Sequence, residues 1–220
     1  MAAGGLDGPR VGPAAGGPAR QLVVLLHGVG ADGQDLIDLA SAWAPALPNA
    51  AFVAPDAPAP CDMAPYGRQW FSLADRSPAR LAAGVAAAAP GLDAFLDAEL
   101  ARLRLPDAAM ALMGFSQGAM MALFVGLRRQ VPPAAILAYS GALLAADLPA
   151  GATARPPVLL VHGAADEVVP VGASRLAEAA LRAANVPVEA LYVPGLGHGI
   201  EVSGLAAGQR LLARAFRPTA

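Results

Sequence analysis

Short, mostly apolar segments alternate with helix-like segments along nearly the whole chain, and this alternation constrains the fold more than any other feature. The apolar segments are read as buried strands because each has about six residues and is bounded by turn signals. Apolar strands that alternate with helices build a parallel sheet covered on both faces. The expected strands are 21–26, 50–55, 108–113, 134–139, 157–162 and 188–193, and the expected helices are 34–46, 81–105, 117–131, 174–184 and 202–216.

The pattern predicts one folded domain over residues 21–220, preceded by a looser arm at 1–20. The arm contains six glycines and three prolines, so we expect a flexible segment or one edge strand near Leu6-Asp7. The segment from Asp56 to Pro78 is longer than most loops of compact domains, and such loops are often functional. We expect the 81–105 helix to break or restart at Pro90-Gly91.

Composition excludes several classes of partner. The net charge is −2 and all 15 basic residues are arginines without a long cluster, so neither nucleic acid nor an anionic membrane surface is an expected partner. Cys61 is the only cysteine, which permits no internal disulfide and fits a reducing compartment. No apolar run reaches the length of a membrane span and no signal-peptide pattern opens the chain, so we expect a cytoplasmic protein.

The sequence Gly114-Phe115-Ser116-Gln117-Gly118 lies between an expected strand and an expected helix. Strand, sharp turn and helix form the context in which G-x-S-x-G becomes a nucleophile elbow. A side chain at either glycine would collide with the neighbouring element, while the serine between them is held where a base can reach it. The motif predicts Ser116 as a catalytic nucleophile.

A serine nucleophile needs a base and a carboxylate that orients this base. The α/β-hydrolase order is serine, acid, histidine, and of the three histidines only His198 has a strand-ending acidic residue between it and Ser116. That residue is Asp166, with Glu167 as its neighbouring competitor. The glycines around His198 let its loop bend over the sheet edge. We therefore predict a triad of Ser116, Asp166 and His198.

The tetrahedral intermediate needs two backbone N–H donors. The residue after the nucleophile, Gln117, supplies one, and the loop 27–33 after the first long strand is expected to supply the other. The glycines of this loop have two other readings, a phosphate-binding loop and a plain strand-to-helix turn. Neither a P-loop pattern nor G-x-G-x-x-G is present, which argues against nucleotide binding.

Several segments together resemble the phospholipase/carboxylesterase family of small α/β-hydrolases, which includes bacterial carboxylesterases and acyl-protein thioesterases. The matching stretches follow the family order over nearly the whole chain and are 26–33, 55–58, 67–71, 114–118, 163–166 with Val169-Pro170, and 197–198. The resemblance implies an α/β-hydrolase fold with a mainly parallel central sheet and no large lid domain. Ala119 departs from the pattern, which often has a second glycine after the elbow.

The resemblance also implies roles for further residues. It assigns the second oxyanion donor to the backbone of Val29, where the family more often has leucine. It places Trp70 and Phe71 beside the active site, although core packing explains these two aromatics equally well. Together with the apolar loop that carries Cys61 and Met63, the region around Trp70 is our candidate for an acyl pocket.

We predict a serine hydrolase that cleaves short- to medium-chain carboxylic esters through an acyl-enzyme. No cofactor or metal is expected, since three scattered histidines and one cysteine form no ligand cluster. Four alternatives stay open: a thioesterase or lysophospholipase on the same site, an amidase, a catalytically inactive α/β-hydrolase used as a binding module, and a structural subunit. The expected partner is a small acyl ester, with a homodimer possible and no stable membrane insertion.

Overall fold

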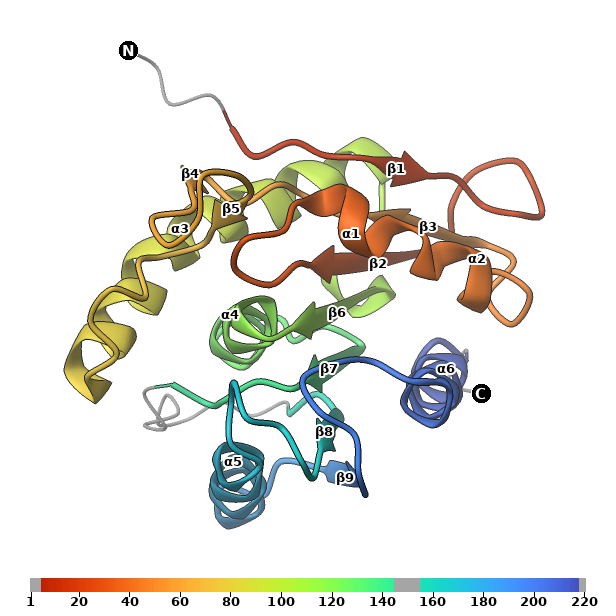
Figure 1. Cartoon of the computed structure of the whole chain (residues 1–220). Coiled ribbons are helices and arrows are strands. Elements are labelled where there is room, and N and C mark those ends of the chain that lie inside the picture. The colour runs from red at the N-terminus through yellow and green to blue at the C-terminus, as the bar shows by residue number, and fades with distance from the viewer. Residues whose placement is uncertain (1–4, 145–154, 218–220) are drawn as a thin grey trace.

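The computed structural model describes residues 5–144 and 155–217, and a seven-stranded sheet forms the centre of the molecule (Figure 1). The strands lie in the order β1-β3-β2-β6-β7-β8-β9, and every neighbouring pair is parallel except β1 with β3. Their bounds are β1 Arg10–Val11, β2 Gln21–Leu26, β3 Ala50–Val53, β6 Met110–Phe115, β7 Ala135–Tyr139, β8 Val158–Gly163 and β9 Val188–Val193. The predicted mainly parallel sheet is confirmed.

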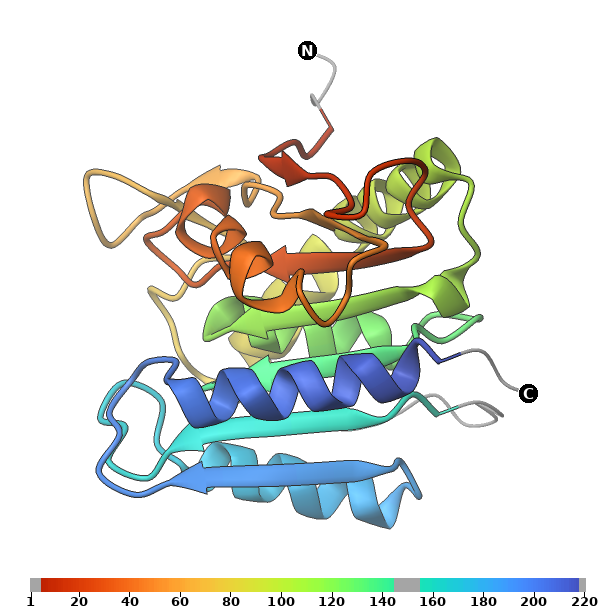
Figure 2. The same ribbon diagram turned by 90° about the vertical axis from the view of Figure 1, so that its right-hand side faces the viewer.

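Helices cover both faces of this sheet (Figures 1 and 2). On one face lie α3 (Pro78–Leu103), α4 (Gln117–Gly126) and α5 (Gly172–Ala183), and on the other lie α1 (Gly33–Ile37), α2 (Leu39–Trp43) and α6 (Val202–Ala215). A short 3-10 helix, Asp107–Ala109, precedes β6. Successive strand residues point to opposite faces, so Val24 and Leu26 join one core cluster while Val23 and Leu25 join the other.

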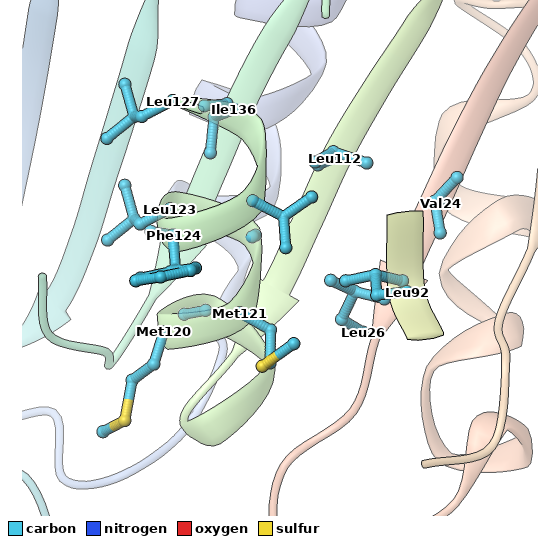
Figure 3. Close-up of a cluster of buried hydrophobic side chains, with 14 of the residues drawn as sticks. Val24, Leu26, Leu92, Leu112, Met120, Met121, Leu123, Phe124, Leu127 and Ile136 are labelled. Carbon is cyan, nitrogen blue, oxygen red and sulfur yellow. The ribbon is translucent and has the colours of Figure 1, made fainter. Parts of the chain in front are cut away.

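Helix α4 is buried along its whole length, which fixes its position behind the centre of the sheet. Its side chains Met121 and Leu123 belong to one buried cluster with Leu112 of β6 and Leu92 of α3 (Figure 3). A helix that is apolar all round belongs in a core. The residue before α4 therefore stands on a rigid support.

The chain departs from the predicted elements at three helices. The expected helix 34–46 is two short helices, because α1 ends at its C-cap, Asp38, and α2 begins directly after it. Helix α3 runs continuously through Pro90, which is exposed, so the loss of one intrahelical hydrogen bond is tolerated at the water-facing side. Helix α4 ends at Gly126, about one turn before the predicted end.

Two short strands and one shifted strand also differ from the prediction. The loop from Asp56 to Pro78 contains an antiparallel pair, β4 (Ala59–Pro60) with β5 (Arg68–Gln69). The edge strand of the N-terminal arm is β1 at Arg10–Val11 rather than Leu6-Asp7, although the Asp7 carbonyl also accepts a hydrogen bond, from the Asp56 amide.

Helix α3 is the one helix within residues 5–144 and 155–217 that is long and apolar enough to cross a membrane by length and composition. Its residues Val85, Leu92 and Leu96 are fully buried in the same cluster as α4. Its other face is exposed, which is the arrangement of an amphipathic helix that covers one side of a sheet.

Candidate active site

The turn between β6 and α4 has the geometry of a nucleophile elbow. Ser116 has φ +54° and ψ −117°, a backbone conformation that costs free energy and is found mainly where surrounding structure enforces it. A Cβ atom at Gly114 would lie 2.2 Å from the Gly118 carbonyl oxygen, and one at Gly118 would lie 1.9 Å from the Leu26 oxygen. Both positions therefore require glycine, and the two glycines hold Ser116 at the carboxyl end of β6.

Asp166 and His198 are brought together by the loops after β8 and β9. His198 Nδ1 lies 2.7 Å from Asp166 Oδ2, and the Asp166 side chain is fully buried. The backbone amides of Val168 and Val169 both donate to Asp166 Oδ1 at 2.9 Å. Glu167, the competitor, is exposed.

The surroundings of Asp166 keep its carboxyl group ionised. Burial raises the pKa of Asp166, but the hydrogen bonds from His198 and from the two backbone amides outweigh burial and hold the pKa below its ordinary value. An ionised carboxylate at Nδ1 fixes the tautomer of His198, so the imidazole carries its hydrogen on Nδ1 and offers Nε2 as a base.

His198 also lies beside the elbow. Its ring centroid is 4.8 Å from that of Phe115, the residue before Ser116. Within the described part of the chain the Ser116 hydroxyl makes no hydrogen bond with His198. Catalytic hydrogen bonds are often long before substrate binds, so the absence of this bond does not contradict the predicted triad.

The loop after β2 is held close to Ser116 by His27. The His27 ring is buried, its Nδ1 lies 2.7 Å from the Gly28 carbonyl oxygen, and its Nε2 accepts a hydrogen bond from the Ala57 amide at 2.9 Å. Burial lowers the pKa of His27, which favours the neutral ring that these partners require. A Cβ on Gly28 would lie 3.3 Å from the Ser116 Cβ, so glycine permits this close approach.

A cavity of about 200 Å³ opens at Ser116. Val29 and Gln117, the predicted oxyanion donors, line it together with Ser116, so both backbone segments expected to bind the oxyanion border the same cavity as the serine. The remaining lining is mostly apolar and consists of Leu73, Arg76, Leu81, Met120, Ala142, Leu144, Val168, Val169 and Pro170.

The predicted acyl pocket needs correction. Trp70 and Phe71 are buried in the core beside the site and do not line the cavity, and Met63 is 53% exposed at the tip of the β4–β5 loop. The resemblance correctly placed Trp70 and Phe71 beside the elbow, where both contact Gln117, but neither belongs to the cavity lining. The cavity walls come instead from the start of α3 and from the loops after β7 and β8.

Sequence reasoning missed the role of the Gln117 side chain. Its Oε1 accepts a hydrogen bond from the Trp70 amide at 2.9 Å and its Nε2 donates to the Phe71 carbonyl at 2.7 Å. Because Gln117 is fully buried, these bonds tie the 70–71 segment to the elbow. The resemblance that placed Trp70 beside the site was the one signal for this contact.

In the described residues, no group of three or more histidine, cysteine or acidic side chains is arranged to hold a metal ion. The site itself brings together a serine, an imidazole held by a buried carboxylate, and two backbone segments that border the same cavity. Such a set performs acyl transfer.

Comparison with known proteins agrees with this chemistry. Residues 10–214 match the family model described as Phospholipase/Carboxylesterase. The chain is 32% identical over 184 residues to esterase YpfH of Escherichia coli K12, which covers 84% of this chain and 78% of that protein. It is 30% identical over 157 residues to acyl-protein thioesterase 1 of Schizosaccharomyces pombe, which covers 67% and 69% of the two chains. The crystal structure of esterase PE8 superposes with a TM-score of 0.91 at 42% identity, covering 96% of this chain and all of that one.

Proposed function

Because the chain belongs to the phospholipase/carboxylesterase family and has the α/β-hydrolase fold, we propose that it cleaves short- to medium-chain carboxylic esters through an acyl-enzyme on Ser116. The observation that carries this proposal is the 2.7 Å hydrogen bond between His198 and the buried Asp166, beside a strained serine that lines a mostly apolar cavity. Family membership supports ester hydrolysis in general, and the geometry supports the particular residues.

The proposed mechanism gives each of these groups one role. His198 Nε2 takes the Ser116 proton as Oγ attacks the ester carbonyl carbon, and the amides of Val29 and Gln117 stabilise the oxyanion. His198 then returns the proton to the leaving alcohol. Water attacks the acyl-enzyme with His198 again as base, which releases the carboxylic acid and restores Ser116. Asp166 stays ionised throughout and stabilises the imidazolium.

The cavity volume supports the proposed chain length. A protein cavity of about 150 Å³ holds one benzene molecule, so about 200 Å³ accommodates an acyl chain of roughly six to eight carbons. Longer chains would have to leave the cavity and enter solvent. We therefore propose that activity rises from acetate to hexanoate or octanoate esters and declines for decanoate.

Replacing the triad residues tests the mechanism. Ser116→Ala and His198→Ala should each lower kcat about 10⁴- to 10⁶-fold, and Asp166→Asn on the order of 10⁴-fold, measured with p-nitrophenyl esters. Labelling with a fluorophosphonate probe should require Ser116. A folded Ser116→Ala protein that keeps ester hydrolysis within tenfold of wild type would contradict the assignment, and a wild-type protein that neither labels nor turns over would favour an inactive binding module.

A second series tests the cavity. Ala142→Phe fills part of the cavity and should move the preferred ester towards acetate, while Met63→Ala, which alters an exposed residue outside the cavity, serves as the matched control. An unchanged preference in Ala142→Phe would refute the acyl-pocket assignment. Because one relative is an acyl-protein thioesterase, thioesters of the same acyl chains belong in the panel, and a higher kcat/KM for thioesters would make thioesterase activity the principal function.

A further inference from the structure

His162 is a buried histidine that the mechanism above does not use, and it contacts the same carboxylate as His198. It lies near the end of β8 with a fully buried side chain. Its Nε2 is 3.2 Å from Asp166 Oδ2, the oxygen that is 2.7 Å from His198 Nδ1. One carboxylate oxygen therefore lies between two imidazole rings.

The partners of His162 fix where its hydrogen lies. Its Nε2 is also 2.8 Å from the Val169 carbonyl oxygen, so both neighbours of this nitrogen are acceptors. Its Nδ1 is 2.6 Å from Ser174 Oγ, a hydroxyl that can donate to a neutral ring or accept from a charged one. Nε2 therefore carries a hydrogen in either charge state of the ring.

Resting on the proposed function, we propose that His162 is a positioning residue whose Nε2–H, bonded to the Val169 carbonyl, lies against Asp166 Oδ2 at 3.2 Å and thereby sets the basicity of His198. The amides of Val168 and Val169 bind one carboxylate oxygen, and the two histidines share the other. Three hydrogen-bond donors, the two amides and His198, hold the carboxylate in one orientation. The partial positive charge of the His162 Nε2–H beside Oδ2 also stabilises negative charge on the oxygen that His198 uses.

The same hydrogen of His162 connects the carboxylate to the wall of the cavity. Val169, whose carbonyl accepts it, lines the cavity, as does Pro170 next to it. A change at His162 therefore acts on the proton relay and on the adjacent acyl-pocket wall together, which a residue that merely fills core space would not do.

The direction of the effect on His198 does not depend on the charge of His162. Without the donor, Asp166 keeps more negative charge towards His198 and stabilises the imidazolium more strongly. Loss of a positive ring at position 162 would act in the same direction. Among the described residues, Asp166 is the one ionisable side chain that forms a hydrogen bond or ion pair with either imidazole. Removing the His162 N–H should therefore make His198 a stronger base.

The test compares variants that keep or lose this donor. His162→Gln places an amide N–H near the position of the imidazole Nε2, whereas His162→Asn is too short to reach it and His162→Met has no donor. Each folded variant is assayed for kcat and KM against p-nitrophenyl butyrate over pH, and thermal unfolding is followed separately. Histidine-labelled protein gives the titration midpoint of His198 by NMR without any turnover, since the chain has only three histidines.

We expect His162→Asn and His162→Met to lower kcat on the order of 10- to 100-fold. In these two variants the acid limb of kcat/KM and the NMR titration midpoint of His198 should both move to higher pH. In His162→Gln both quantities should stay near their wild-type values. Either donor-less variant suffices if the other does not fold. The inference is overturned if a folded donor-less variant keeps the wild-type midpoint and acid limb, even with a lower melting temperature. Loss of activity in Ser116→Ala tests the proposed function separately. The NMR midpoint of His198 is measured without turnover, so it can test the role of His162 even if the proposed function is wrong.

Discussion

One glycine of the elbow offers a sharp test of how the fold positions Ser116. In Gly118→Ala the new Cβ would lie 1.9 Å from the Leu26 carbonyl oxygen and 2.6 Å from that of His27. Both contacts are with backbone, so no side chain can rotate away. Leu26 ends β2, a central strand that pairs with both β3 and β6.

The magnitude follows from the required displacement. Side-chain Cβ atoms essentially never approach other atoms closer than 3.0 Å, so α4 and the end of β2 must separate by about 1.1 Å, the difference between that limit and 1.9 Å. Overpacking of a core typically costs about 1–3 kcal/mol, and a backbone clash at a central strand belongs at the upper end. For a domain of this size, about 3 kcal/mol lowers the melting temperature by roughly 6–12 °C.

The same chemical change elsewhere should have the opposite sign, which provides a matched control. Gly91 lies at an exposed position inside α3, and a Cβ there meets nothing within 4 Å. Alanine in an open helix position is favoured over glycine by roughly 0.5–1 kcal/mol, mainly because the unfolded chain loses less entropy. Gly91→Ala should therefore raise the melting temperature slightly and leave the active site unchanged.

Urea unfolding and thermal melting followed by circular dichroism measure both variants, and the rate of fluorophosphonate labelling reports on the elbow. We expect Gly118→Ala to be destabilised and slow to label, and Gly91→Ala to be stabilised and to label like wild type. The reasoning is refuted if Gly118→Ala loses less than about 1 kcal/mol or if the two variants shift in the same direction.

Three further predictions concern stability. Burial raises the pKa of Glu99, but hydrogen bonds from two arginines outweigh burial and hold this pKa below its ordinary value. Glu99→Gln should therefore be less stable than wild type at pH 7. In urea titrations, this difference in the free energy of unfolding should shrink as the pH falls below about 4.3. Tyr139→Phe removes a buried hydroxyl that donates to the Gly204 carbonyl at 3.0 Å, and equilibrium unfolding should show a loss of about 1–3 kcal/mol. Ser140 has φ +50° and a buried hydroxyl without a hydrogen-bond partner, so Ser140→Gly should raise the free energy of unfolding by about 1 kcal/mol, and a loss would contradict the strain argument.

The sequence predicted the strands well because strand formation here is governed by burial. Strands β2 and β9 have the predicted bounds, although β9 lies at the sheet edge and is only partly buried. The pair β4–β5 was missed because two-residue strands containing a proline show no alternation of apolar and polar residues. The break expected at Pro90 is absent, since packing of α3 on both sides of it outweighs a local preference.

The site was predictable to different degrees for a physical reason. Ser116, Asp166 and His198 follow strands, and parallel strands end at one edge of the sheet, so their convergence could be anticipated from order alone. The cavity walls come from Leu73, Ala142 and Val168, which lie on separate loops and approach one another only through tertiary packing. No spacing in the sequence encodes that approach, and the apolar loop around Met63 was an equally good candidate.

Backbone strain separates the functional edge from the rest of the fold. Among the described residues, four non-glycine residues have positive φ: Arg104, Ser116, Ser140 and Asn185. Arg104 caps the C-terminal end of α3 and Asn185 follows the cap of α5, where a left-handed residue satisfies the last carbonyl groups of a helix. Ser116 and Ser140 end no helix. They follow the adjacent strands β6 and β7, and the Ser116 amide donates to the Tyr139 carbonyl at 2.8 Å, directly before Ser140. The two strained residues that cap no helix C-terminus therefore lie at the ends of adjacent central strands, and one of them is the proposed nucleophile. This is the pattern expected when stability is given up to hold a reactive group in place.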